Sequence, residues 1–114
     1  ALGLAIKSEL QAMNELYDMS AKSVYELNKT SATHGSVNSA PDSSRSRYIT
    51  EDAPYLLVPC SQFAQLLNIP VPIVDSVLHL TSALNDDDYF TSGRTLEKMG
   101  LGDMTSAEII AKIS

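Results

Sequence analysis

The sequence has 114 residues, enough for one domain with a modest hydrophobic core. Its 44% apolar content is ordinary for a soluble globular protein, and its net charge of −6 disfavours nucleic acid or an anionic membrane surface as a partner. No apolar run approaches the ~20 residues of a membrane-spanning helix, no signal peptide is expected, and the single cysteine, Cys60, rules out an internal disulfide and favours a reducing cytoplasm.

The first expected element is one long amphipathic helix over residues 3–28. Its apolar side chains recur at steps of three and four, which is the period of a helix face. They are Leu10, Met13, Tyr17, Ala21 and Val24. Residues 30–46 are rich in Ser, Asn, Gly and Pro and nearly devoid of large apolar side chains, so they predict a loop. His34 lies in this loop, where we expect it to be exposed.

The run from Arg47 to Pro59 reads RYITEDAPYLLVP and carries a cation, two acids and two tyrosines. Its two prolines predict that it is not helical. In an extended strand Arg47 and Asp52 would lie roughly 17 Å apart, so they form one site only if the chain turns between them. Thr-Glu-Asp-Ala-Pro has the chemistry of a turn. Such a site suits carboxylate binding and proton handling; a surface ion pair or a capped turn is the alternative.

Two helices are expected in the middle of the chain. Residues 60–67 predict a short helix that Asn68 ends. A linker with two prolines follows, and the second proline suits the first position of a helix over residues 72–84. His79 lies on this helix beside the apolar stripe. We expect it to be a structural or exposed histidine rather than a catalytic one.

The last part of the chain predicts short elements. Residues 85–88, Asn-Asp-Asp-Asp, lack the alternating ligands and central glycine of a calcium loop and predict a solvated turn. Residues 94–99 predict a short helix that Gly100 ends, and residues 105–108, Thr-Ser-Ala-Glu, fit a capping box that opens a last helix through Ile113. We expect no strand, and the spacing of Cys and His offers no metal site.

Three ordered blocks carry a family resemblance: residues 47–59, the segment 68–84, and Gly-Arg-Thr-Leu-Glu-Lys-Met-Gly-Leu at 93–101. Together they resemble the C-terminal α-helical domain of the octopine/nopaline (opine) dehydrogenase family, whose members typically show Arg-Tyr-x-Thr-Glu-Asp-Val-Pro-x-Gly-Leu-Val-Pro, a Val-Pro-x-Pro helix start and Gly-Arg-Thr-Leu-Glu. The resemblance implies an all-α helical bundle, like the C-terminal domain of 6-phosphogluconate dehydrogenase. Residues 1–114 would be a single substrate-binding or dimerisation domain. We expect a fragment of a longer chain whose N-terminal Rossmann domain is absent from this sequence.

The resemblance also implies a chemistry. Opine dehydrogenases are oxidoreductases that join an amino acid to a 2-oxo acid through an imine, which NADH or NADPH reduces. It implies that Arg47 binds a substrate carboxylate, for which a planar guanidinium is suited. It implies that Asp52 is catalytic and orients a histidine located upstream of this segment, because neither His34 nor His79 matches the family histidine. Residues expected to support the site are Tyr48, Thr50 and Glu51.

Two departures from the family pattern qualify this reading. Ala53 replaces the usual Val, a mild change in packing, and Leu56 replaces a Gly, which matters if that position needs a positive φ or a close approach of substrate. Arg94 and Glu97 are expected to pair within the fold. The alternative function is a non-catalytic helical dimerisation or interaction module, and a homodimer is a candidate assembly. This chain alone is expected to bind no cofactor and no metal, and to be catalytically inert.

Overall fold

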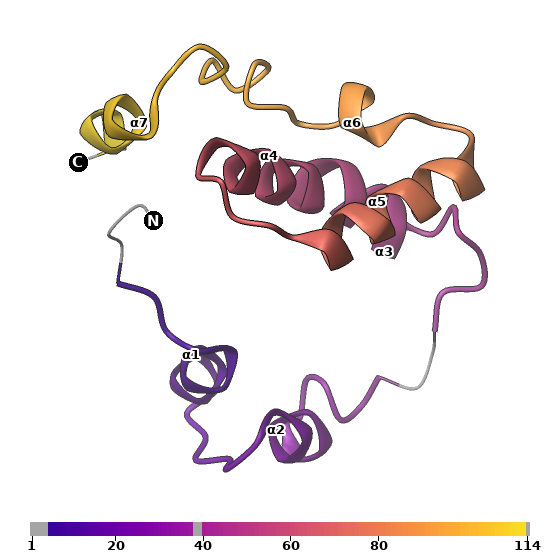
Figure 1. Cartoon of the computed structure of the whole chain (residues 1–114). Helices are drawn as coiled ribbons and strands as arrows, with labels where there is room; N and C mark the ends of the chain where they lie inside the picture. Colours follow the sequence, from indigo (N-terminus) through magenta and orange to yellow (C-terminus); the bar gives the residue numbers. More distant parts are fainter. Residues whose placement is uncertain (1–4, 38–39, 114) are drawn as a thin grey trace. The chain divides into compact units, whose positions relative to one another are not determined.

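The computed structural model describes residues 5–37 and 40–113, and every regular element in these ranges is helical (Figure 1). This confirms the all-α fold class. The described residues form two compact units, one that ends at Ala40 and one that begins at Pro41. Whether residues 1–114 act as a single domain stays a prediction. No helix in the described ranges is long and apolar enough to cross a membrane.

The unit before Pro41 contains two short helices, α1 (Glu9–Leu16) and α2 (Val24–Thr30). The prediction of one uninterrupted helix is therefore wrong. Asn14 bridges to the backbone of Ala21 in both directions, because its Oδ1 accepts from the N–H and its Nδ2 donates to the carbonyl, each at 2.9 Å. Asp18 adopts a left-handed backbone with φ 52°, which Asp tolerates. Ser23 then starts α2 by accepting from the Glu26 N–H at 3.1 Å. Apolar spacing continues through this break, but the local polar contacts compete with the helix and prevail.

His34 is half-buried rather than exposed, contrary to expectation. Its Nε2 lies 3.2 Å from the Tyr17 hydroxyl, and the two rings meet edge to face with centroids 5.4 Å apart. Tyr17 is the residue that ends α1. Of the loop predicted over residues 30–46, residues 31–37 and 40–46 contain no helix, Thr30 belongs to α2, and residues 38–39 lie outside the described residues. The His34–Tyr17 contact fastens residues 31–37 to the end of α1.

The unit from Pro41 onward begins with a nearly continuous helical run. The helix α3 (Arg47–Thr50), the π turn η1 (Ala53–Leu57) and the helix α4 (Val58–Leu66) follow one another, and the intervening Glu51 and Asp52 have right-handed helical angles. The prediction that the two prolines prevent helix here is therefore wrong. Each proline occupies the first turn of its element, where a missing N–H costs little.

The π turn leaves one carbonyl free for a tertiary contact. The Val58 N–H donates to the carbonyl of Ala53, five residues back. Pro59 has no N–H with which to continue that pattern, so the Pro54 carbonyl accepts from the Arg94 N–H at 2.8 Å instead. This hydrogen bond ties the segment that follows α6 (Tyr89–Ser92) to the π turn.

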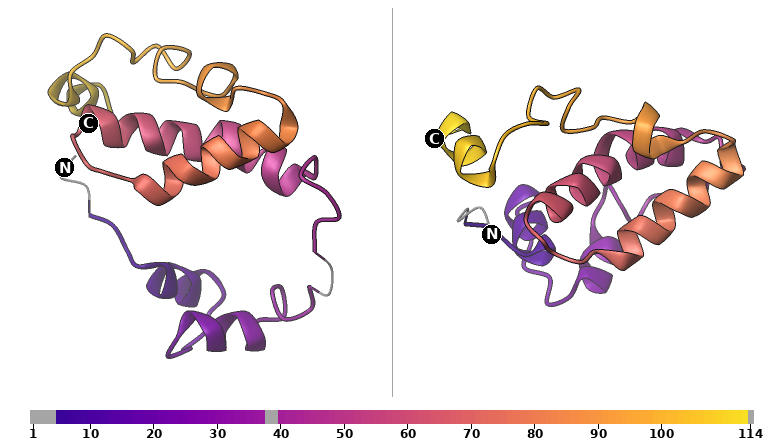
Figure 2. Two further views of the ribbon diagram at one scale, coloured as in Figure 1. Left: turned by 45° about the vertical axis from the view of Figure 1, so that its right-hand side comes forward. Right: turned by 45° about the horizontal axis from the view of Figure 1, so that its top comes forward.

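The helix α4 stops at Asn68, as predicted. Asn68 is left-handed with φ 54°, its N–H donates to Gln65, and the Ile69 N–H donates to Ala64 at 2.8 Å, which is the Schellman pattern. After a linker, α5 (Pro72–Asn85) runs back beside α4, as both views in Figure 2 show. Its extent agrees with the prediction to within one residue. The core cluster of this unit comprises Ala53, Val58, Leu78 and Tyr89.

The segment after α6 is not the predicted helix. Residues 96–100 form turns, and a single contact, the Met99 N–H to the Thr95 carbonyl at 3.1 Å, spans four residues there. Lys98 uses its ammonium group at the end of α6, donating to the carbonyls of Thr91, Ser92 and Gly93 at 2.8, 2.7 and 3.0 Å. A cation placed on the last carbonyls of a helix satisfies groups that the helix itself leaves unpaired.

The last helix, α7 (Ser106–Ile113), begins with the predicted capping box. The Thr105 hydroxyl accepts from the Glu108 N–H at 3.3 Å, and the Glu108 carboxylate accepts from the Thr105 N–H at 2.8 Å. The sequence predicts a solvated turn over residues 85–88. Residues 86–88 are exposed, as predicted, but Asn85 is buried at the end of α5.

Candidate functional site

The five predicted site residues all lie on the helical run rather than on a turned loop. An α-helical path from Arg47 to Asp52 spans about 7.5 Å of rise and about 140° of rotation, so the two side chains lie much closer than an extended chain would place them. Arg47, Tyr48, Glu51 and Asp52 line one open hollow of ≈ 330 Å³. The helix therefore brings the Arg47 guanidinium and the Asp52 carboxylate to one surface, which the sequence predicts a turn to do.

Arg47 is held by Glu51 and not by Asp52. Its Nη2 donates to Glu51 Oε2 at 3.1 Å, and the two side chains are four residues apart on one face. Both are largely exposed, so solvent screens the pair and it contributes between 0 and about 1 kcal/mol. Asp52 is exposed, and no hydrogen bond of its carboxylate is found within the described residues. The surface ion pair considered as an alternative therefore exists, but its acid is Glu51.

The two remaining support residues differ in position. Tyr48 is exposed and lines the same hollow. Thr50 is half-buried, its hydroxyl donates to the Ser46 carbonyl at 3.3 Å, and it lines a different pocket. Thr50 is thus not gathered with the other four.

The departures at Ala53 and Leu56 are compatible with the fold. Ala53 is buried in the core. Leu56 lies in the π turn with its side chain exposed, and the non-glycine residues with positive φ in the described ranges are Asp18, Asn68 and Asp86. Leu56 therefore does not occupy a glycine-type conformation in this chain, and its backbone carries no strain of that kind.

Arg94 and Glu97 do not form the expected pair in the described part of the chain. The guanidinium of Arg94 lies over the Tyr55 ring, 5.5 Å from its centroid, at a distance typical of a cation–π contact. Glu97 is exposed. His79 behaves as expected: it is exposed, and its ring lies 4.7 Å from that of Phe90.

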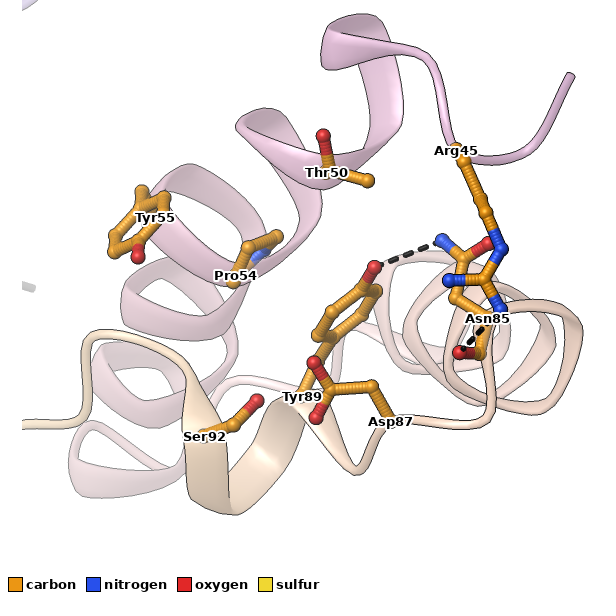
Figure 3. Close-up of a pocket in the computed structure, with 8 residues that line it drawn as sticks. All are labelled: Arg45, Thr50, Pro54, Tyr55, Asn85, Asp87, Tyr89 and Ser92. Atoms are coloured by element: carbon orange, nitrogen blue, oxygen red, sulfur yellow. Dashed lines mark hydrogen bonds between the residues drawn. The ribbon is translucent and has the colours of Figure 1, made fainter.

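A second pocket, which the sequence reasoning missed, lies where the ends of α5 and α6 meet the π turn (Figure 3). Three of its members are buried, namely Pro54, Asn85 and Tyr89, and a 2.8 Å hydrogen bond runs from the Asn85 amide to the Tyr89 hydroxyl. A signal for Asn85 was present, because positions 74, 78, 81 and 85 form one inward stripe of α5. A polar residue on such a stripe predicts a buried hydrogen-bonding role.

The described residues contain no group of three or more His, Cys, Asp or Glu side chains that could hold a metal. The two glycines in closest contact, Gly35 and Gly93, face backbone carbonyl oxygens, which lie 2.6–2.8 Å from the position of an added Cβ. A phosphate cradle presents N–H groups instead. These glycines therefore serve close packing.

Comparison with known proteins agrees with the all-α fold. The family described as the NAD/NADP octopine/nopaline dehydrogenase α-helical domain matches residues 1–85, and the chain belongs to this family. The chain is 36% identical over 109 residues to an opine dehydrogenase of Arthrobacter sp. (strain 1C) and 29% identical over 110 residues to a vitopine synthase of Allorhizobium ampelinum. Each alignment covers 96% of this chain and 30% of the relative, so the chain spans about a third of the length of these curated proteins.

Proposed function

We propose that this chain is the substrate-binding helical part of an opine-dehydrogenase-like oxidoreductase of the cytoplasm. The whole protein would condense an amino acid with a 2-oxo acid, or catalyse the reverse reaction, with NADH or NADPH supplying or accepting the hydride. The observation that carries the proposal is the hollow that Arg47 and Asp52 share, in a chain of this family. The dinucleotide would bind to the remainder of the protein, in the Rossmann domain that the family resemblance implies.

Arg47 is the proposed carboxylate-binding residue. Its guanidinium is exposed and presents parallel N–H donors that match a carboxylate. Its present partner, Glu51, is a weakly held surface carboxylate that a substrate carboxylate can replace at little cost in free energy. Glu51 would thus keep Arg47 in place until substrate arrives.

Asp52 is the proposed positioning group for a histidine from another part of the protein. A carboxylate beside an imidazole holds it in one tautomer and stabilises the imidazolium formed during proton transfer. His34 contacts Tyr17, and His79 packs against Phe90 at a tilted angle, so neither is proposed for this role. The exposed Asp52 carboxylate is available to a histidine that docks on the hollow.

The test is the substitution Asp52→Asn in the full-length protein. We expect turnover to fall roughly 100-fold or more, as for the loss of general acid–base assistance, with little change in melting temperature because Asp52 is exposed. The matched control is Glu51→Gln, one residue away, which removes the ion pair and frees Arg47. It should preserve turnover and lower the substrate KM by up to about fivefold, the equivalent of about 1 kcal/mol. A lowered melting temperature with normal turnover for Asp52→Asn would make Asp52 a structural residue.

A non-catalytic dimerisation module is the second candidate, and one observation favours it. The outer face of α5 carries an apolar stripe at heptad spacing, formed by Ile73, Val77, Leu80 and Leu84 with exposed fractions of 77%, 39%, 60% and 57%. Such a stripe suits pairing with the same helix of a second copy. Sedimentation of a Leu80→Lys variant would test it, because a change from dimer to monomer is expected only if the stripe forms the interface.

A further inference from the structure

The second pocket gathers polar groups that the proposed function does not use. It has a volume of ≈ 400 Å³, within the range of small-molecule sites, and its lining mixes one cation, one anion, hydroxyls and an amide. The lining residues are Arg45, Thr50, Pro54, Tyr55, Asn85, Asp87, Tyr89 and Ser92 (Figure 3). None of them belongs to the hollow of Arg47 and Asp52.

The Asn85 amide has one unsatisfied side. Asn85 is only 7% exposed, and its Nδ2 donates to the Ser44 carbonyl at 2.9 Å and to the Tyr89 hydroxyl at 2.8 Å. A carbonyl can only accept, so the Ser44 contact determines which end of the amide is nitrogen. Asn85 Oδ1 is left buried with no hydrogen-bond partner in the described part of the chain. A buried acceptor without a donor destabilises the fold, and a ligand donor would remove this cost.

Tyr89 supplies the complementary donor. Its oxygen accepts from Asn85, so its own O–H hydrogen remains to be donated. Tyr89 is 4% exposed, and Asn85 holds its hydroxyl in one place. The Asn85–Tyr89 pair therefore presents an acceptor and a donor from one rigid unit built on α5 and α6.

The charged residues of the pocket come from two different loops. Arg45 precedes α3, and its guanidinium makes one long contact, 3.5 Å to the Asn85 backbone carbonyl. Asp87 lies in the turn after α5 and is exposed. In Figure 3 the Arg45 side chain lies beside Asn85, with its guanidinium directed at the Asn85 backbone carbonyl.

We propose that this pocket binds a small zwitterion. Its ammonium group donates to Asn85 Oδ1 and to the Asp87 carboxylate, and its carboxylate accepts from the Arg45 guanidinium and the Tyr89 hydroxyl. Each of the four protein groups then has a partner of the opposite hydrogen-bonding type, and the two charges are both neutralised. The proposal does not rest on the proposed function, because its residues are separate from Arg47 and Asp52.

The first experiment is a titration of the full-length protein carrying Arg47→Gln, which removes the other candidate carboxylate site. With ¹⁵N-labelled asparagine, glycine is expected to shift the Asn85 side-chain amide signal saturably. Glycine betaine, which keeps both charges but has no N–H, should bind roughly tenfold more weakly, as for the loss of a charge-assisted hydrogen bond. Acetate, which has no cation, should also bind more weakly than glycine.

The second experiment uses variants of the exposed charged residues. Arg45→Gln and Asp87→Asn should each weaken glycine binding roughly tenfold. Asp86→Asn is the matched control, since it removes the adjacent carboxylate, which does not line this pocket, and it should leave binding unchanged.

Three results would overturn the proposal. The absence of a saturable shift would mean that solvent alone occupies the pocket. Equal affinity for acetate and glycine would show that the pocket recognises only the carboxylate and is an anion site. Equal effects of Asp86→Asn and Asp87→Asn would assign the binding to the general negative charge of residues 86–88. None of these results bears on the role of Asp52, which the turnover of Asp52→Asn tests separately.

Discussion

Gly93 shows how a single residue of the family motif positions the fold. An added Cβ would lie 2.6 Å from the Tyr89 carbonyl oxygen and 2.7 Å from that of Pro54. The same Pro54 carbonyl accepts from the Arg94 N–H. The backbone after α6 can reach the π turn only because residue 93 has no side chain. Its φ of −68° is ordinary, so the requirement is one of space and not of backbone conformation.

The substitution Gly93→Ala should therefore destabilise the protein by about 1–3 kcal/mol, the usual cost of forcing a methyl group into a packed contact. Urea denaturation would measure this loss. The control is Gly100→Asn: Gly100 is left-handed with φ 71°, and nothing lies within 4 Å of an added Cβ. Because Asn tolerates that conformation, its loss should be smaller. Equal losses at the two positions would show that the contact between residue 93 and the π turn does not exist in solution.

At the scale of elements, the capping box of α7 couples helix formation to pH. The Thr105 N–H and the Thr105 hydroxyl both donate to the Glu108 carboxylate, each at 2.8 Å. The backbone bond is the larger cause, and together the two bonds lower the pKa of Glu108 from its ordinary value of 4.5. A carboxylate whose pKa is depressed on folding stabilises the folded state above its unfolded pKa. That stabilisation is lost as the pH falls through the folded pKa.

We therefore expect α7 to lose helical order as the pH falls below 4.5. ¹³Cα chemical shifts of residues 106–113 would follow the helix, and the carboxyl signal of Glu108 would report its titration midpoint. The variant Glu108→Gln cannot titrate, and its α7 signals should show a flatter pH dependence. A midpoint at or above 4.5 would contradict the capping contact.

The helix α5 shows what periodicity leaves open at this scale. It has two adjacent stripes, one at positions 74, 78, 81 and 85 and one at positions 73, 77, 80 and 84. Leu78 is fully buried, whereas Leu80 is 60% exposed. Both stripes have helical spacing, and the more apolar one faces outward. Because α4 and the π turn pack against α5, the stripe that contains Asn85 is the buried one. Spacing alone does not predict which of the two stripes is buried.

At the scale of the whole molecule, the chain spans about a third of the length of the curated relatives it matches. Gly35 and Gly93 pack against carbonyl oxygens, whereas a glycine that cradles a pyrophosphate lies beside N–H groups.

Residues 1–114 expressed alone should therefore show no saturable change in NADH or NADPH fluorescence, whereas the full-length protein should bind one of the two nucleotides. Circular dichroism of the isolated chain would show whether it is folded in the same buffer. Saturable micromolar binding by the folded isolated chain would contradict the assignment of the cofactor to the rest of the protein.

The sequence by itself determined the fold class and several helix ends. The helix ends at Asn68 and at Thr105 with Glu108 are formed by hydrogen bonds between residues no more than five positions apart. A local stretch of sequence is therefore enough to predict them. The three blocks at 47–59, 68–84 and 93–101 predict the family correctly. The prediction that Pro54 and Pro59 prevent a helix is wrong, because each lies in the first turn of its element.

Only the tertiary structure decided the remaining features. The π turn is joined to Arg94 through the Pro54 carbonyl, and Asn85 is joined to Ser44 across 41 positions of sequence. The acid that pairs with Arg47 also depends on whether residues 47–52 form a turn or a helix. In a helix Glu51, four residues after Arg47, lies on the same face and forms the ion pair. Contacts between distant residues carry no local periodicity or capping signal, and packing energy rather than intrinsic propensity determines them.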